Sequence, residues 1–454
     1  MSAPNRQRLL GLLDLERARY QRERPRSRAL SEASVNLLAG VPMTWMGKWA
    51  GGFPLGFSRA RGATITDLDD HDLVDFALGD TGAMAGHSPP ALLEALRQRV
   101  DVNGGVTTML PTEDAQWVGA ELTRRFGLAR WSFTLSATDA NRWALRLARM
   151  VTGRPKVLVF SYSYHGTVDE SFVVLDHGGR AVNRPGNVAP AVDPTTTTRV
   201  VEFNDLAGLA VALASRDVAA VLCEPALTNI GIVLPEEGFF SGVRELCDAT
   251  GTLLIIDETH TISAGPGGAT ARWALEPDAL TIGKSFGGGV PCGAYGLSEE
   301  FAERVLLFAK HGNDLEDVGG IGGTLAGNAL SLAAMRAVLG EVLTDAAFVE
   351  MERVAGVFAS GVRRSIKEHE LAWSITQLGA RCEYRFVDPA PRDGGASARA
   401  SDEALEEYLH LYAVNRDVLL TPFHNMALMC PDTTVADVER HQSVFDGALT
   451  ELLA

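Results

Sequence analysis

The sequence predicts an α/β protein with a larger domain built on a mostly parallel sheet and a smaller α+β domain. Through the middle of the chain, short continuous apolar segments alternate with amphipathic helical ones, as is typical of strands buried on both faces. From about residue 326 onward, helical patterns dominate, with one strand candidate among them. At 454 residues the chain is also longer than one compact core usually organises, so we expect more than one domain.

The elements of the larger domain follow in a regular order. Apolar residues recur at helical spacing over 113–126, with Thr112 placed as the N-cap and Gly127 as the stop. The strand candidate WSFTL comes next, and a second amphipathic helix follows it. Helical segments near 205–215 and 238–250 separate some of the later strands. These later strand candidates read KVLVF, AAVLCE, TLLII, DALTI and CGAYGL.

The two ends of the chain complete the prediction. The segment ATITDLDDHDLVDFA is typical of a hairpin, CEYRFVD is a late strand candidate, and PAPRDGGASARA after it reads as a mobile surface loop. Four further helices are expected, at 327–340, 345–368, 402–416 and 435–453. We therefore predict an N-terminal segment, 1–75, that packs with the small domain, a large domain, 76–325, and a C-terminal small domain, 326–454.

Composition and charge argue against several classes of partner. The net charge of −16 disfavours nucleic acid or an anionic membrane, and no stretch approaches the ~20 apolar residues that span a bilayer. The first 30 residues alternate in charge without an apolar signal core, which favours a solvated helix. Five scattered cysteines with no C-x-x-C pair suit a reducing cytoplasm and offer no metal site.

The segment DALTIGKSFGGGVPCGA carries the most chemical information. It places Lys284 at the end of an apolar strand candidate, in a chain that has only five lysines. An apolar surrounding favours the neutral amine, which is the form a Schiff-base nucleophile needs. The glycines that follow would let a bulky ligand approach the backbone closely. A partly buried lysine paired with an acid is the alternative, and this segment alone does not separate the two.

The segment around Lys284 matches other sequence motifs less well. GKSFG fits the G-x-S-x-G pattern of hydrolases, with Ser285 as the nucleophile, but that elbow must turn directly into a helix. The GGGVPCG that follows is a poor helix former. A Walker A loop would need glycine at position 278, which is Asp278. A Ser285 hydrolase therefore stays a distant alternative.

A Schiff-base lysine can hold pyridoxal phosphate, and other segments contain residue types that a site for this cofactor would need. WSFTLSATDANRWAL runs from a strand into a helix N-terminus, where the N–H groups of Ala137 and Thr138 would face an anion. Asp257 ends a strand candidate and would hold a protonated ring nitrogen, and Lys284 follows 27 residues later at the end of a neighbouring strand. Tyr164, in SYSYHGT, is a candidate platform for the ring. Each residue also has an ordinary explanation, as a cap, a turn residue or part of the core.

Five segments occur in the order seen in class III pyridoxal-phosphate aminotransferases. They read SATDANRWALRLARMVTGRPKVLVFSYSYHG, CEPALTN, LLIIDETHT, TIGKSFGGGVPCGAYG and GGTLAGNALSLAAM. The chain resembles this family over roughly residues 35–450, and it most resembles the glutamate-1-semialdehyde aminomutase branch. The resemblance implies the fold-type-I, aspartate aminotransferase-like fold and the cofactor pyridoxal 5'-phosphate.

The resemblance also implies catalytic roles. Lys284 would carry the cofactor as a Schiff base and move the proton during the reaction. Asp257 would hold the pyridinium nitrogen, and Tyr164 would stack on the ring. The family's D-E-V is here Asp257-Glu258-Thr259, so a hydroxyl replaces an apolar contact to the ring.

Further roles concern cofactor binding. Ala137 and Thr138 would bind the phosphate, and Asn229 would reach the phenolic oxygen. Thr324 would contact the phosphate of the neighbouring subunit, which implies a homodimer with shared active sites. The family's S-G-T-E-A reads S-A-T-D-A here, so the methyl group of Ala137 enters the phosphate cup.

The substrate side departs from the aminomutase branch. That branch holds a substrate carboxylate with an arginine in its N-terminal loop, whereas this chain has GVPMTWMGKWAGGFP there. Trp45 lies near that arginine's place and Lys48 is the only cation, so we expect both in the substrate site, facing an aryl or long aliphatic group. Packing at a domain interface is the alternative. Arg381 or Arg385 could substitute for a carboxylate-holding arginine of related transaminases, although exposed strand arginines are commoner.

We therefore predict a cytoplasmic, pyridoxal-phosphate-dependent aminotransferase. It would move an amino group from an amine or amino acid, with an apolar or aromatic side group, to a keto acid or aldehyde by a ping-pong mechanism. An intramolecular aminomutase is the alternative within the family, and a non-catalytic cofactor-binding regulator is one outside it. We expect small-molecule substrates and a second copy of the chain as partners, but neither nucleic acid nor a membrane.

Overall fold

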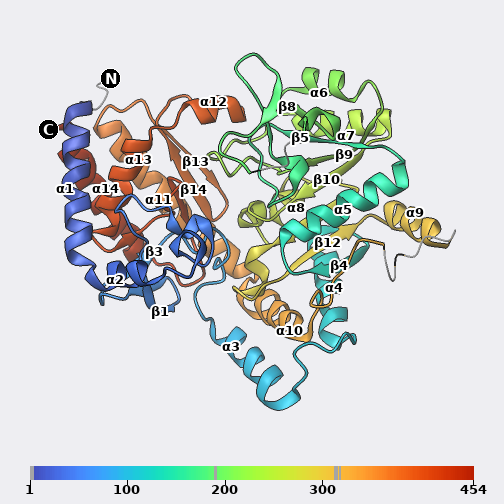
Figure 1. The fold of residues 1–454 in the computed structure, drawn as a ribbon, viewed down its shortest axis with the longest axis horizontal. Coiled ribbons are helices and arrows are strands. Elements are labelled where there is room, and N and C mark those ends of the chain that lie inside the picture. The colour runs from blue at the N-terminus through green and yellow to red at the C-terminus, as the bar shows by residue number, and fades with distance from the viewer. Residues whose placement is uncertain (1–4, 189–191, 311–314, 316–318) are drawn as a thin grey trace. The chain divides into compact units, whose positions relative to one another are not determined.

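The computed structural model describes residues 5–188, 192–310, 315 and 319–454 (Figure 1). The chain forms two compact units. The smaller unit comprises Met1–Pro89, Ala346–Ala390 and Ala400–Ala454. The larger unit comprises Pro90–Asp345 and Pro391–Arg399.

The unit boundaries lie later in the chain than positions 75 and 325, where the sequence analysis placed them. Packing inside the larger unit explains the difference. Helix α3 (Pro90–Arg97) contacts helix α10 (Ala329–Ala337), so the segments that carry them join the larger unit at both of its ends.

A seven-stranded sheet forms the larger unit, in the order β4-β12-β11-β10-β9-β5-β8. Neighbouring strands are parallel except at β12, which runs antiparallel to both β11 and β4. The strands are β4 (Arg130–Thr134), β5 (Lys156–Phe160), β8 (Thr198–Val201), β9 (Val218–Cys223), β10 (Leu253–Asp257), β11 (Ala279–Gly283) and β12 (Gly293–Leu297). The mostly parallel sheet is confirmed, and all six strand candidates of the larger domain form strands of it. Strand β8 was not predicted.

Successive side chains of the strands enter two separate apolar clusters, one on each face of the sheet. Val157 and Ile255 belong to the cluster under α5, whereas Leu158 and Ile256 belong to the cluster with α6 and α7. Figure 1 shows α5 lying across one face of the sheet. The helices are α5 (Ala137–Thr152), α6 (Leu206–Leu213) and α7 (Phe239–Thr250). Burial on both faces explains why the strand sequences are continuously apolar.

The other elements of the larger unit surround this sheet. Helix α4 forms over the predicted 113–126 and ends at Gly127, whose φ is 76°, but the Thr112 hydroxyl makes no capping hydrogen bond. Besides α3 and α10, the elements are α4 (Glu113–Phe126), α8 (Gly268–Arg272), α9 (Glu299–Lys310), α12 (Gly394–Arg399), β6 (Val173–Leu175) and β7 (Ala181–Asn183).

The prediction of a mobile loop at PAPRDGGASARA is wrong for its second half. Residues 394–399 form helix α12, in which Gly394 is buried against Ser161 of the same unit. The Asn204 amide donates a hydrogen bond to the Arg392 carbonyl at 2.8 Å, which fixes the entry to the helix. Glycine and polar composition suggested disorder, but a long-range contact orders the segment.

The smaller unit combines helices with two small sheets. Strands β2 and β3 form the predicted hairpin, and α1 packs on α13. The helices are α1 (Arg6–Glu23), α2 (Pro25–Ala33), α11 (Asp345–Glu368), α13 (Glu403–Val414) and α14 (Val435–Leu453). The strands are β1 (Phe57–Arg61), β2 (Thr64–Asp67), β3 (Asp72–Asp75), β13 (Ser374–Leu378), β14 (Arg381–Arg385), β15 (Val418–Leu419) and β16 (Met426–Leu428). Across the residues that the structure describes, no helix has the length and apolarity needed to cross a membrane.

Candidate active site

The predicted cofactor residues of the larger unit lie at one edge of its sheet. Strands β5, β9, β10 and β11 are parallel neighbours, and Tyr164, Asn229, Asp257 and Lys284 stand at or after their carboxyl ends in that order. Strand β4 runs in the same direction, because β12 is antiparallel to both β4 and β11, so the start of α5 also lies at this edge. Open α/β sheets bind their ligands at this edge.

Asp257 is buried and strongly hydrogen-bonded. Its Oδ2 lies 3.0 Å from His165 Nδ1 and accepts from Asn141 Nδ2 at 2.8 Å, while Oδ1 accepts from the Thr259 N–H at 3.0 Å. Burial alone would raise the pKa of Asp257, but the hydrogen bond and charge of His165, with the other donors, outweigh it and lower the pKa. The carboxylate is therefore ionised at neutral pH, which is the form that holds a protonated ring nitrogen.

A second layer of side chains fixes this carboxylate. The Thr281 hydroxyl, on the neighbouring strand β11, donates to Asn141 Oδ1 at 2.5 Å. His165 is fully buried, and its Nε2 has no hydrogen-bond partner among the described residues. The sequence analysis quoted His165 beside Tyr164 but gave it no role, and it missed Asn141, because both reach Asp257 only through the fold.

Lys284 follows β11 in an unusual backbone conformation. Its φ is 59°, in the left-handed region that residues with side chains seldom adopt. The preceding Gly283 packs so closely on α5 that an added Cβ would lie 2.7 Å from the Ala137 nitrogen. The Lys284 ammonium nitrogen lies 2.8 Å from Nε2 of the buried His260, a residue to which the sequence analysis gave no role. Lys284 is thus held at the sheet edge beside a second titratable group.

The start of α5 is suited to a phosphate. The Ser136 hydroxyl caps the helix by accepting a hydrogen bond from a backbone N–H of the first turn. The first N–H groups of a helix, here at Ala137 and Thr138, lack intrahelical partners and lie at the positive end of the dipole. The Thr138 hydroxyl accepts from the Thr167 N–H at 3.0 Å and can still donate its own proton. Gly166 leaves room here, since an added Cβ would meet that hydroxyl.

Hydrogen bonds connect the loops after β5 and β9. The Tyr164 N–H donates to Glu224 Oε1 at 3.1 Å, and the Thr228 hydroxyl donates to the other carboxylate oxygen. Burial raises the pKa of Glu224. Asn229 Oδ1 accepts a hydrogen bond from Arg184 Nη2 at 3.0 Å. Because Thr228 and Asn229 are neighbours in sequence, Tyr164 and Asn229 belong to one connected group. It also includes Arg184, which the sequence analysis did not consider.

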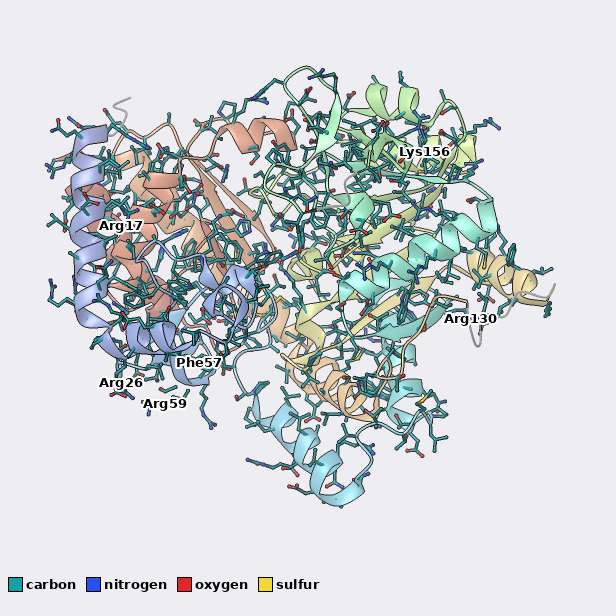
Figure 2. All side chains as sticks on the ribbon, in the orientation of Figure 1. Arg17, Arg26, Phe57, Arg59, Arg130 and Lys156 are labelled. Atoms are coloured by element: carbon teal, nitrogen blue, oxygen red, sulfur yellow. The ribbon has the colours of Figure 1, made fainter. Side chains whose placement is uncertain are left out.

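The geometry gives little support to the alternative interpretations of the segment that contains Lys284 and Ser285. Ser285 is fully buried within the single 3-10 turn Lys284–Gly287, and no helix follows, so the hydrolase elbow is absent. Lys156, which is labelled in Figure 2, pairs with Asp217 at 3.6 Å, as expected of an ordinary surface lysine. Within the part of the chain that the structure describes, no group of three or more His, Cys, Asp or Glu residues could hold a metal ion.

The remaining predicted site residues lie elsewhere. Thr324 is exposed in the turn before α10. Trp45 and Lys48 belong to the smaller unit, in and directly after the 3-10 turn Thr44–Gly47. Trp45 is 45% exposed, and its ring meets the edge of Phe423 at 6.5 Å between centroids.

Arg381 and Arg385, the two candidate substitutes for a carboxylate-holding arginine, are not exposed as strand arginines commonly are. They are 1% and 6% exposed on β14, because that strand is covered inside the smaller unit. Arg381 donates to the Thr81 hydroxyl. Arg385 donates to the Ser401 hydroxyl at 2.8 Å and lies 3.8 Å from a carboxylate oxygen of Glu406. Both guanidinium groups make structural contacts within their own unit.

Comparisons with known proteins identify the family of this chain. The model of the family "Aminotransferase class-III" matches residues 46–445. A glutamate-1-semialdehyde 2,1-aminomutase of Chloroflexus aggregans is 34% identical over 415 residues, covering 88% of this chain and 92% of that protein. A crystal structure of a glutamate-1-semialdehyde-aminomutase from Pseudomonas aeruginosa PAO1 covers 100% of both chains, with 49% identity and a TM-score of 0.97. An omega-transaminase from Sphaerobacter thermophilus covers 96% of this chain and 99% of its own, with 27% identity and a TM-score of 0.85.

The cofactor follows from the same comparisons. A lysine-to-alanine variant of the Pseudomonas protein has been solved in complex with PMP, the amine form of pyridoxal phosphate. The ionised Asp257, the amine of Lys284 and the helix N-terminus at Ala137 have the chemistry that this cofactor requires. The predicted family, fold and cofactor are confirmed: the chain is a pyridoxal-phosphate-dependent enzyme that belongs to the class-III aminotransferase family.

Proposed function

We propose that this chain is an intramolecular aminomutase, which moves an amino group between neighbouring carbons of one small substrate. The observation that carries the proposal is the full-length similarity, at 49% identity, to a protein named glutamate-1-semialdehyde-aminomutase. The sequence analysis put transfer to a second substrate first and the aminomutase second. The comparisons favour the opposite order, and we adopt it.

The residues at the sheet edge support this chemistry. Pyridoxal phosphate supplies an electron sink that stabilises negative charge on the carbon bearing the amino group. Lys284 would hold the cofactor aldehyde and, once released, its amine would remove and return a proton at that carbon. His260, 2.8 Å from this amine, would orient it. Asp257 would keep the ring nitrogen protonated, in the orientation that His165 fixes.

The other predicted contacts complete the proposed binding site. Ala137 and Thr138 would hold the phosphate, Tyr164 would stack on the ring and Asn229 would reach the phenolic oxygen. Thr324, which is exposed before α10, would contact the phosphate of a second copy. We therefore propose a homodimer with shared sites, which light scattering of the purified holoenzyme would measure as twice the chain mass of 48.6 kDa.

Transfer to a separate acceptor is the second candidate. Two observations favour it: the N-terminal loop GVPMTWMGKWAGGFP contains no arginine, and an omega-transaminase shares the fold at 27% identity. Both reactions need the same cofactor residues, so the larger unit does not separate them.

The test is whether turnover needs a second substrate. Purified holoenzyme is incubated with glutamate 1-semialdehyde and other amino aldehydes, without any keto acid, and the products are resolved by chromatography. An aminomutase yields the positional isomer with the amino group retained. Turnover that appears only after pyruvate or 2-oxoglutarate is added would establish the transaminase instead. Retained cofactor without reaction in either assay would leave a cofactor-binding protein.

A further inference from the structure

Arg184 lies beside the proposed cofactor site. It directly follows β7, and its backbone N–H donates to the Phe172 carbonyl at 2.9 Å. Its guanidinium donates to Asn229 Oδ1 at 3.0 Å and lies 5.7 Å from the centroid of the Tyr162 ring. The side chain is therefore anchored on the connected group that contains Tyr164 and Asn229.

Within the described part of the chain, the Arg184 guanidinium has no acidic partner, and only one of its donors is used on another residue. Among the described residues, no carboxylate oxygen lies within 4 Å of its guanidinium nitrogens. Three other partly buried arginines of the larger unit have such a partner, namely Arg149 with Glu170 at 2.6 Å, Arg199 with Asp217 at 2.8 Å and Arg244 with Asp278 at 3.0 Å. Arg154 has none in the ranges that the structure describes, but its guanidinium donates to the Val218 and Thr250 carbonyls and to the Thr252 hydroxyl. In a chain of net charge −16, a cation without an acid at a ligand-binding edge points to an external anion.

The charges around Arg184 leave its guanidinium able to bind such an anion. Burial lowers the pKa of Arg184, and the nearby Tyr162, Glu224 and Tyr164 oppose the effect. The carboxylate of Glu224 accepts hydrogen bonds from the Tyr164 N–H and the Thr228 hydroxyl, and it does not lie within ion-pair distance of the guanidinium. A guanidinium has five N–H donors, stays charged at neutral pH and binds carboxylates through two parallel hydrogen bonds. One of these donors is used here, on Asn229.

We propose that Arg184 holds the carboxylate of the substrate, so that this enzyme acts on amino acids and their derivatives rather than on simple amines. The inference rests on the proposed function, because it takes the ligand at this edge to be the reacting molecule. It also supplies what the N-terminal loop lacks, since that loop has Trp45 and Lys48 but no arginine. Arg381 and Arg385 are both buried in the smaller unit, where they donate to the Thr81 and Ser401 hydroxyls.

The experiment measures carboxylate binding without catalysis. Holoenzyme is titrated calorimetrically with pentanoate and with pentanamide, which have the same length but differ in charge. We expect wild type to bind pentanoate more tightly, and Arg184→Gln to lose roughly 10- to 100-fold in pentanoate affinity with little change for pentanamide. Arg184→Lys keeps the positive charge but lacks the paired N–H donors of a guanidinium. Its affinity for pentanoate should lie between those of wild type and Arg184→Gln.

Arg180 offers a matched control on the same hairpin. Its side chain is 82% exposed and pairs with Asp176 at 2.7 Å. Arg180→Gln removes the same charge from the same region and should bind pentanoate as wild type does. Equal pentanoate affinity in Arg184→Gln and wild type would overturn the inference, and so would an equal loss in both variants, which would indicate a long-range charge effect.

Cofactor content separates the remaining outcomes. Cofactor released by alkali and measured by absorbance should be stoichiometric in wild type and in all three variants. Loss of cofactor in Arg184→Gln would mean that Arg184 holds the cofactor rather than the substrate, which also overturns the inference. The binding assay stands even if no amino aldehyde turns over, so the failure of the proposed function is distinguishable from the failure of this inference.

Discussion

The sheet edge of the larger unit and the N-terminal loop of the smaller unit differ sharply in how their side chains are held. At the sheet edge, Asp257 is 3% exposed, and His165 and Asn141 are fully buried around it. In the loop, Met46 is 48% exposed and Trp45 is 45% exposed. The first region fixes a carboxylate through several hydrogen bonds, whereas the second presents apolar side chains to whatever binds. We therefore expect the catalytic chemistry to depend on the rigid sheet edge and the choice of substrate on the more adaptable loop.

The largest expected effect tests the rigid region. Asp257→Ala removes the charge that we propose lies at the ring nitrogen, so we expect kcat to fall by about 10²–10³-fold, as for the loss of other preorganised electrostatic groups. Asp257→Asn keeps the shape of the side chain but also removes its negative charge, so its kcat should be reduced almost as much. Rates are measured at saturating substrate with cofactor content checked in each variant. A loss below about 5-fold in both variants would show that this carboxylate does not act on the reacting system.

Acid should affect the two units differently. Burial lowers the pKa of His441 to about 3 and that of His410 to about 4, both in the smaller unit. Below pH 6.5 the unfolded chain binds protons that these folded histidines do not, so stability falls as pH drops from 6.5 toward those values. Each histidine costs about 2 kcal/mol between pH 6.5 and 5. Asp257 behaves oppositely: its lowered pKa means that its stabilising contribution persists until the pH falls below about 4.

His441→Phe provides the matched variant for the acid prediction. The His441 ring stacks on Phe445 at 5.7 Å, so phenylalanine suits the site without a titrating group. Urea unfolding at pH 6.5 and 5 should show a smaller loss in this variant than in wild type, by about 2 kcal/mol. An identical pH dependence in both proteins would exclude His441 as its source.

Local patterns predicted the parts of the molecule that depend on neighbours in sequence. Continuous apolar runs located the strands, and the spacing of Asp257 and Lys284 placed them on adjacent strand ends, which the parallel pairing of β10 and β11 confirms. Contacts between distant segments were not predictable in this way. Arg184 meets Asn229 across 45 positions, and Arg381 is buried by strands that pair only in the fold.

The smallest expected effect tests the adaptable region. Trp45→Ala should raise KM for substrates with aryl or long aliphatic groups by about 3- to 10-fold, because one aromatic contact contributes about 0.5–1.5 kcal/mol. Cofactor content and the urea midpoint should stay unchanged, since the side chain is half exposed. If KM is unaffected while the midpoint drops, Trp45 packs the protein rather than the substrate.

The central claim is that Lys284 carries the cofactor, and chemical trapping tests it most directly. Holoenzyme is reduced with sodium borohydride, digested and mapped by mass spectrometry. A pyridoxyl phosphate adduct on the peptide that contains Lys284, and loss of that adduct when substrate is added before the reductant, is the result we predict. An adduct on any other lysine of active enzyme, with Lys284 unmodified, would contradict it.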